Sequence, residues 1–269
     1  MRIRISHTTR FSYANPPAFG LVQLRARPQT SPAQTVHDWQ LDLAGAREQA
    51  RFSDGFGNRV DLLELLPDAT EVELTVSGEV DTHIEDGVVG RVGSPGTERL
   101  YLRQTPLTEP GPAMAELLGD LPDTDPLDRL HALSRLVLAR VAYTPGETHA
   151  GTTAREAFRD AEGVCQDHTH IFCGLARRMG IPARYVGGYL LMDDRTDQDA
   201  GHAWAEGFVP DLGWVGFDVS NGISPDGRYI RVAHGLDYRD AAPTRGLTVA
   251  SSGESLSVDI RVEALQSQQ

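Results

Sequence analysis

Three residues in the second half of the chain could together carry out nucleophilic catalysis. Cys165 follows Glu162-Gly163-Val164 and opens a segment of helical spacing, so its thiol is expected in the first turn of a helix. Unpaired amides and the helix dipole favour negative charge there, and the thiolate is the reactive form of cysteine. His202 begins one predicted strand and Asp218 lies in the next. A nucleophile, a base and an orienting carboxylate are the set that acyl transfer requires.

Each of these residues also has an ordinary interpretation when it is taken alone. A cysteine is often a small buried hydrophobe, and a lone His or Asp is usually a surface residue. Cys173 receives that ordinary interpretation, because it lies in the middle of the same predicted helix between Phe172 and Gly174. Eight residues of helix separate the two cysteines by about 12 Å, which excludes a disulfide between them.

A metal site is an alternative use of the same segment. Cys165, Asp167, His168 and His170 are all side chains that bind zinc. On a helix, however, His170 projects away from the face that Cys165 and His168 share, so three of these ligands do not converge without His202. We therefore expect no metal and no other cofactor.

The first hundred residues alternate polar and apolar side chains with a period of two, as in Ile3 and Ile5 or Val72 and Leu74. Asp54-Gly55-Phe56-Gly57-Asn58 supplies turn residues between two such runs, which predicts a hairpin. We expect an all-β domain, a small sandwich, over residues 1–96, ending in a stretch rich in Gly and Pro.

Residues 97–269 are expected to form a second domain of α+β class, with helices first and an antiparallel sheet after them. Helices are predicted after Asp125-Pro126, through Arg140, and from Cys165 to Met179 with one apolar stripe. Three predicted strands follow, from 183 to 192, 202 to 209 and 214 to 221. A last strand, Leu256 to Val262, is expected to close the edge of this sheet.

Strand parity adds a geometric prediction about His202 and Asp218. The two side chains meet only if they lie on the same face of their sheet, and a shift of one residue in register would reverse every side chain. The paired residue numbers must therefore have an even sum, which requires a loop of odd length or a bulge between the strands. Gly213 is the natural residue for the positive φ of such a turn at 210–213.

Composition excludes several classes of partner. The net charge is −13, and all 25 basic residues are Arg, since the sequence has no Lys. This charge opposes binding to nucleic acid. The sequence starts without the apolar core of a signal peptide, and no apolar run approaches membrane-spanning length. These features predict a soluble cytoplasmic protein that binds no nucleic acid and no membrane.

Four blocks in this order resemble the core of the bacterial transglutaminase-like superfamily: Gly163-Val164-Cys165-Gln166-Asp167, Gly180 to Tyr189, Gly201 to Glu206, and Gly213 to Asp218. The front 90 or so residues are similar, through Ser12-Tyr13 and residues 54–58, to the β-rich domain that often precedes that core. The resemblance implies a papain-like fold with Cys165 as nucleophile, His202 as general base and Asp218 as orienting group. The family usually continues from its Asp with Pro-Thr-Asn, whereas Val219-Ser220-Asn221 stands here.

The resemblance leaves the reaction open. A thioester on Cys165 resolved by water makes a protease, amidase or deamidase acting on a peptide or protein amide, and we expect this outcome first. Resolution by an amine makes a transglutaminase, and a catalytically silent binding module is a third alternative. Tyr143, Tyr189 and Trp204 are aromatic candidates for the cleft. The acidic loop 193–199, just before His202, is expected to be mobile and is a candidate gate that raises the pKa of His202.

Overall fold

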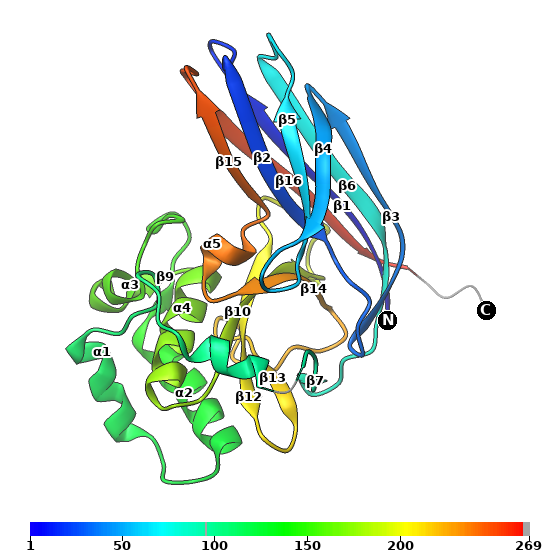
Figure 1. Cartoon of the computed structure of the whole chain (residues 1–269). Coiled ribbons are helices and arrows are strands. Elements are labelled where there is room, and N and C mark those ends of the chain that lie inside the picture. The colour runs from blue at the N-terminus through cyan, green and yellow to red at the C-terminus, as the bar shows by residue number, and fades with distance from the viewer. Residues whose placement is uncertain (95, 266–269) are drawn as a thin grey trace.

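The computed structural model describes residues 1–94 and 96–265. Figure 1 shows a β-sandwich on one side of the molecule and a second sheet, covered by helices, on the other. This arrangement confirms the α+β class and the preceding β-rich region that the sequence predicts. Within the described residues, no helix is both long enough and apolar enough to span a membrane.

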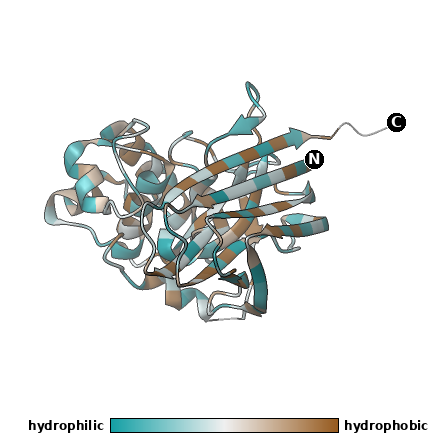
Figure 2. Ribbon diagram, turned by 90° about the horizontal axis from the view of Figure 1, so that it is seen from above, coloured by the Kyte–Doolittle hydropathy of each residue, from teal (hydrophilic) through white to brown (hydrophobic). Residues whose placement is uncertain are grey.

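The sandwich consists of two antiparallel sheets. One has the strand order β11 (Asp197–Gln198), β16 (Ser255–Ala264), β1 (Arg2–Ser12), β6 (Glu71–Thr82) and β3 (Gln34–Ala44). The other has the order β15 (Thr244–Val249), β2 (Phe19–Arg27), β5 (Arg59–Leu65) and β4 (Ala46–Ser53). Phe11, Val22, Leu63 and Leu74 come from both sheets and lie in one buried cluster. The alternation of apolar and polar residues along these strands is visible in Figure 2.

The predicted hairpin at residues 54–58 is confirmed as the turn between β4 and β5. The Asp54 amide donates to Asn58 O over 3.0 Å. The Asp54 carboxylate accepts from the amides of Phe56 and Asn58, over 3.0 and 2.9 Å. These local bonds explain why the turn could be predicted from its residue types.

The second sheet positions the candidate catalytic residues. Its strand order is β14 (Tyr229–Gly235), β10 (Ala183–Leu190), β12 (His202–Val209), β13 (Gly213–Phe217) and β7 (Val88–Gly90). A short parallel pair joins β8 (Ala142–Tyr143) to β9 (Glu162–Gly163). The remaining elements are helical: η1 (Thr97–Leu102), α1 (Pro112–Glu116), η2 (Leu117–Asp120), α2 (Pro126–Arg140), α3 (Ala154–Asp160), α4 (Cys165–Arg178) and α5 (Tyr238–Ala241).

Both predicted helices are confirmed, as α2 and α4. Asp125 caps α2 by accepting from the amides of Leu127 and Asp128. Helix α4 differs from the expected single apolar stripe, because every residue from Asp167 to Arg177 is buried. It lies between the sheet on one side and α2 and α3 on the other, so polar residues of its outer face also need partners inside the protein.

The strand predicted at Leu256 to Val262 exists, but its expected place is wrong. As part of β16 it pairs with β1 over Ile3 to Ser12, and not with the sheet of the second half. β15 likewise pairs with β2 of the sandwich. The alternation of apolar residues predicts a strand with two different faces, but it does not say which edge the strand will join. The predicted domain boundary at residue 96 stays a prediction. The pairing of β15 and β16 shows that residues 244–264 also belong to the sandwich.

Candidate active site

Cys165 is the first residue of α4, as predicted, and it is partly exposed. The turn before it is held by the buried carboxylate of Asp167, which accepts from the Val164 amide at 2.9 Å and from Thr148 Oγ1 at 2.7 Å. Gly163 leaves room for this carboxylate, since a Cβ at that position would lie 2.7 Å from Asp167 Cβ. Burial raises the pKa of Asp167 more than these hydrogen bonds lower it.

The helix start also supplies backbone donors next to the thiol. The amides of Asp167 and His168 both donate to Val164 O, over 3.0 and 3.1 Å. The amides of Cys165 and Gln166 stand at the first two helical positions, where no carbonyl of the helix can reach them. They are therefore the two amides best placed to bind negative charge beside Cys165.

The predicted register between β12 and β13 is confirmed. Ala205 pairs with Phe217 and Val209 with Gly213, which is the even-sum pairing. The loop between the strands has three residues, 210–212, and Gly213 has φ +83°. As a result His202 and Asp218 meet, and His202 Nε2 donates to Asp218 Oδ2 over 2.6 Å. The two side chains therefore lie on the same face of the sheet and within hydrogen-bonding distance.

Asp218 lies one residue beyond β13, which ends at Phe217 rather than at the predicted Asn221. Its Oδ2 also accepts from the Tyr229 hydroxyl and from Asn221 Nδ2, both at 2.7 Å. Burial alone would raise the pKa of Asp218, but the bonds from His202, Asn221 and Tyr229 lower it below its ordinary value. The carboxylate is thus held ionised, and the donors fix its position.

His202 is buried and lies at the first position of β12. Burial lowers the pKa of His202, but its hydrogen bonds to Asp218 and Cys165, together with their charges, outweigh burial and raise the pKa to about 10. Because Nε2 is bonded to Asp218, Nδ1 is the ring nitrogen that remains for the Cys165 thiol. This geometry favours a protonated His202 imidazolium next to the Cys165 side chain.

Two cavities open on either side of the His202 ring. A cavity of about 260 Å³ is lined by Cys165 and His202, and the sandwich supplies its opposite wall through Thr9, Leu256 and Val258. A larger cavity of about 600 Å³ is lined by His202, Tyr143, Asp193 and Asp194, among others. The cavity at the thiol is thus lined by residues from both halves of the molecule.

The four residues of the zinc alternative take separate partners. Asp167 binds the helix start as described above. His168 donates from Nε2 to Val141 O over 3.0 Å and accepts at Nδ1 from Ser220 Oγ over 2.8 Å. His170 Nε2 accepts from the Tyr238 amide over 3.1 Å. Across residues 1–94 and 96–265, no group of three or more His, Cys, Asp or Glu side chains is arranged to hold a metal ion.

The acidic loop differs from its expected role as a mobile connection. Asp197 and Gln198 form β11 and pair with Arg261 and Ile260 of β16, which ties the loop to the sandwich. Asp193 and Asp194 remain at the wall of the larger cavity. The raised pKa of His202 comes from Asp218 and Cys165 and does not depend on these acids.

Of the three aromatic candidates, Tyr143 lines the larger cavity and is half exposed. Trp204 is buried and stacks near His202, with ring centroids 6.3 Å apart. The Tyr189 hydroxyl bonds to His7 Nδ1 over 2.8 Å and joins the sheet to the sandwich. Tyr229 was not predicted from the sequence, because it contacts Asp218 only through the pairing of β14 with β10, for which no local motif exists.

The comparison with known proteins agrees with this geometry. Residues 116–219 match the family model of the transglutaminase-like superfamily, a range that includes Cys165, His202 and Asp218. Residues 3–81 match the bacterial transglutaminase-like N-terminal region. The chain carries a transglutaminase-like core. Its front region is the one found in bacterial members, as the sequence predicts.

Individual relatives of this transglutaminase-like protein extend the match along the chain. An uncharacterized protein of Mycobacterium leprae is 27% identical over 280 residues, covering 98% of this chain and 99% of the relative. A protein-glutamine gamma-glutamyltransferase of Pseudomonas aeruginosa is 27% identical over 147 residues, covering 47% of this chain and 21% of that protein. The crystal structure of a "Putative Cysteine Protease" from Cytophaga hutchinsonii has a TM-score of 0.80 at 20% identity, covering 100% and 92% of the two chains. This last likeness extends the shared fold over the sandwich as well as the core.

One departure of the transglutaminase-like core can now be given a structural meaning. Where the family usually has Pro-Thr-Asn, this chain has Val219-Ser220-Asn221. The side chain of Asn221 donates from Nδ2 to Asp218 Oδ2 over 2.7 Å. The backbone amide of Asn221 donates to Asp218 Oδ1 over 3.2 Å. Ser220 uses its hydroxyl to hold His168 on α4. The altered segment therefore still ties the sheet to the helix that bears Cys165.

Proposed function

We propose that the protein hydrolyses an amide bond in a peptide or protein through a thioester on Cys165. The observation that carries the proposal is the arrangement of Cys165 at the start of α4, opposite a His202 ring whose other nitrogen is bonded to Asp218 over 2.6 Å. These are the positions of a nucleophile, a general base and an orienting group.

The proposed reaction has two steps. His202 holds the proton of the thiol, and the thiolate of Cys165 attacks the amide carbonyl to form a carbon–sulfur bond. The amides of Cys165 and Gln166 stabilise the oxyanion. The imidazolium then protonates the leaving nitrogen as the carbon–nitrogen bond breaks, which leaves a thioester. In the second step His202 takes a proton from water, and the resulting hydroxide attacks the thioester carbonyl. The carbon–sulfur bond then breaks, the carboxylic acid leaves, and the sulfur of Cys165 recovers its proton from the His202 imidazolium.

The larger cavity supports water as the second nucleophile. A cavity of about 600 Å³ has room for several water molecules beside His202. An enzyme that transfers its acyl group to an amine must exclude this competing water. A cavity of this size instead admits water next to His202.

Transfer to an amine is the second candidate, and one feature favours it. Asp193 and Asp194 line the larger cavity, and their charge would attract an ammonium group. The partial match to a protein-glutamine gamma-glutamyltransferase is consistent with that chemistry in a related core. Because the sequence has no Lys, the protein cannot serve as its own ε-amine acceptor.

The experiment that tests the proposal offers the purified protein a panel of Gln- and Asn-containing peptides, with and without a small primary amine, and follows each peptide by mass spectrometry. Hydrolysis predicts cleaved or deamidated peptides in both conditions, whereas transfer predicts an amine adduct. A covalent ladder of the protein, formed without an added acceptor, would contradict the inference that the protein cannot serve as its own amine acceptor. Acid quenching should trap the acyl group on Cys165, and Cys165→Ala is the control.

A silent binding module would behave differently in the same protein preparation. A thiol-alkylating probe at neutral pH should modify Cys165 in preference to the buried Cys173, and a failure to do so would favour the silent module. The cytoplasmic location expected from the sequence remains part of this proposal, supported by two cysteines that are both free thiols.

A further inference from the structure

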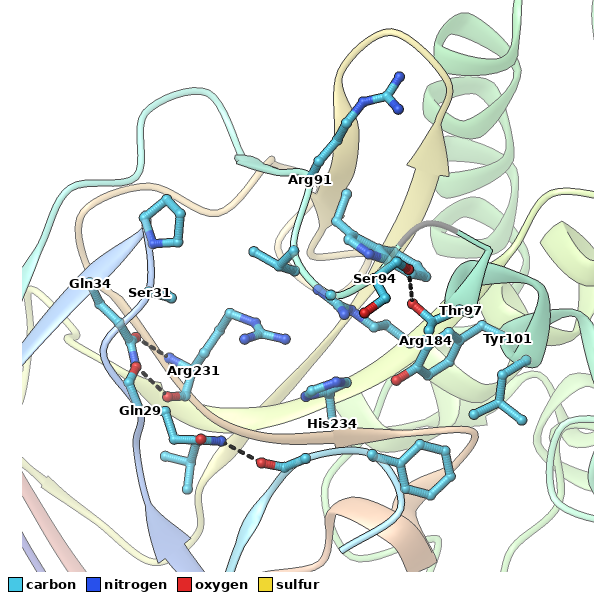
Figure 3. Close-up of a pocket in the computed structure, with 18 of the residues that line it drawn as sticks. Gln29, Ser31, Gln34, Arg91, Ser94, Thr97, Tyr101, Arg184, Arg231 and His234 are labelled. Carbon is cyan, nitrogen blue, oxygen red and sulfur yellow. Dashed lines mark hydrogen bonds between the residues drawn. The ribbon is translucent and has the colours of Figure 1, made fainter. Parts of the chain in front are cut away.

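A third cavity lies away from Cys165, between the turns of the sandwich and the sheet of the core. It measures about 710 Å³ and is bordered by the segment 29–34, the hairpin 55–57 and the sheet residues Arg184, Trp214 and Arg231. Figure 3 shows side chains from these separate segments turned toward one space. Among the described residues, those that line this cavity are different from those that line the two cavities beside His202. We call it the arginine pocket.

The charge of the arginine pocket is opposite to that of the whole protein. The chain carries a net charge of −13. The described lining nevertheless includes Arg91, Arg184 and Arg231 and contains no Asp or Glu. The Arg91 side chain points away from the pocket, toward Pro210 O (Figure 3), whereas the side chain of Arg184 is buried and that of Arg231 is largely buried. A hollow of this charge in an acidic protein concentrates anions.

Behind the pocket wall, one carboxylate serves both deep arginines. Glu206 is fully buried and accepts from Arg184 Nε at 2.6 Å and from Arg231 Nε at 2.7 Å. Two guanidinium groups against one carboxylate leave one net positive charge. Because both side chains are largely buried, this excess positive charge attracts a further anion.

The contacts of Arg184 fix the position of one of these two guanidinium groups. Its side chain is 3% exposed, and its Nη2 lies 2.6 Å from Glu206 Oε2, but without the alignment of a hydrogen bond. The guanidinium stacks on the Trp214 ring, with its carbon 3.9 Å from the centroid, so the ring holds it in place. The pocket wall thus holds a buried guanidinium whose position is fixed by Glu206 and Trp214 and whose Nη2 has no well-aligned hydrogen bond.

His234 adds a neutral polar group to the same wall. Burial, and then the charges of Arg184 and Arg231, lower the pKa of His234 well below its ordinary value. The ring therefore stays uncharged at neutral pH and can donate or accept a single hydrogen bond. The arginines, and not His234, therefore supply the positive charge of the pocket.

We propose that the arginine pocket is a binding site for a small organic anion, whose carboxylate or phosphate oxygens bind Arg184 and Arg231. The planar guanidinium fork matches both groups. The volume is that of an ordinary small-molecule site. Glu206, which orients both arginines, lies on β12 with His202, and the four-residue interval places the two about 13 Å apart along the strand. The ligand therefore occupies a site separate from the thiol.

The test measures binding of three probes, inorganic phosphate, phenyl phosphate and benzoate, to the full protein by isothermal titration calorimetry, with chloride at matched ionic strength as the reference. At least one probe should bind more tightly than chloride, and Arg231→Gln should weaken its binding at least tenfold. Tighter binding of the phosphate probes than of benzoate assigns the site to phosphate, and the reverse order assigns it to carboxylate. Equal weakness of all three probes and chloride would overturn the proposal.

A second pair of variants separates charge from folding. Thr30 lines the exposed side of the pocket, and its Oγ1 accepts from the Val36 amide over 3.0 Å. Asp and Asn can both replace that acceptor, but only Asp adds a negative charge to the pocket. Thr30→Asp should weaken probe binding severalfold, and Thr30→Asn should leave it unchanged. If both variants bind as the natural protein does, the pocket is not an anion site, whatever the stability of Arg231→Gln.

Discussion

The start and the middle of helix α4 place the same side chain in opposite surroundings. Cys165, at the start, is partly exposed and lies beside two free helix amides and the His202 imidazole. Cys173, two turns later, is fully buried among apolar side chains of the core, and burial raises its pKa to about 12. The difference shows that the position along the helix, rather than the residue type, decides the surroundings of each thiol, and only the surroundings of Cys165 suit the nucleophile that we propose.

The strongest test of this comparison is to remove each thiol in turn. Cys165→Ala should abolish turnover of any amide substrate, a loss of at least about 10³-fold, because no other group can form the thioester. Cys173→Ala should retain activity within about threefold, since that thiol touches no reacting atom. Steady-state rates of the two folded variants decide it. Equal loss in both variants would remove Cys165 from its assigned role.

A smaller effect is expected when the orienting carboxylate is changed. Asp218→Asn should lower kcat by about 10²- to 10⁴-fold with the fold intact, because the neutral amide no longer stabilises the His202 imidazolium. The bonds from Tyr229 and Asn221 allow the variant side chain to keep its place. Circular dichroism controls for folding. An unchanged kcat would mean that another residue orients the ring.

The pH dependence of stability tests the coupling of His202 to the thiol at the start of the helix. The pKa of His202 is raised from 6.5 to about 10, so its contribution to stability is complete below about pH 6.5 and is lost as the pH rises through 10. Cys165 is one cause of this rise, so in Cys165→Ala the loss should begin at lower pH. Urea unfolding at pH 6, 8 and 10 measures it. Identical profiles for both proteins would contradict the coupling of thiol and imidazole.

The smallest effect concerns packing alone. Cys173→Ala removes one buried sulfur from the core and should lower the free energy of unfolding by roughly 1 kcal/mol. Urea unfolding at neutral pH measures it, and Cys173→Val serves as a matched control of similar apolar character. A gain in stability from the alanine would show that the core is strained around this thiol.

The parts of the site that depend on local sequence could be predicted. The helix start at Cys165 follows from Gly163 and the apolar spacing after it, and the positive φ of Gly213 follows from strand parity. Once His202 and Asp218 are required to meet, the two-residue period of a strand is enough to predict the even-sum register between β12 and β13. Each of these inferences rests on residues that are near one another in the chain.

The parts that depend on distant pairing could not be predicted. Tyr229 reaches Asp218 from another strand, and Thr148 reaches Asp167 from a loop, so neither has a local signal. The place of β16 was wrong for the same reason, since alternation fixes its faces and not its neighbour. Thr9 lines the cavity at Cys165 only because the sandwich packs against the core, and no local sequence pattern predicts that packing.

The pairing of β16 with β1 also bears on how the molecule is made. Residues 2–12 are synthesised well before their partner at 255–264, and contacts so distant in sequence form slowly. Leu256 and Val258 of that late strand line the cavity at Cys165. A nascent chain that has not yet reached residue 255 can therefore bring Cys165 and His202 together while this wall of the cavity is still missing.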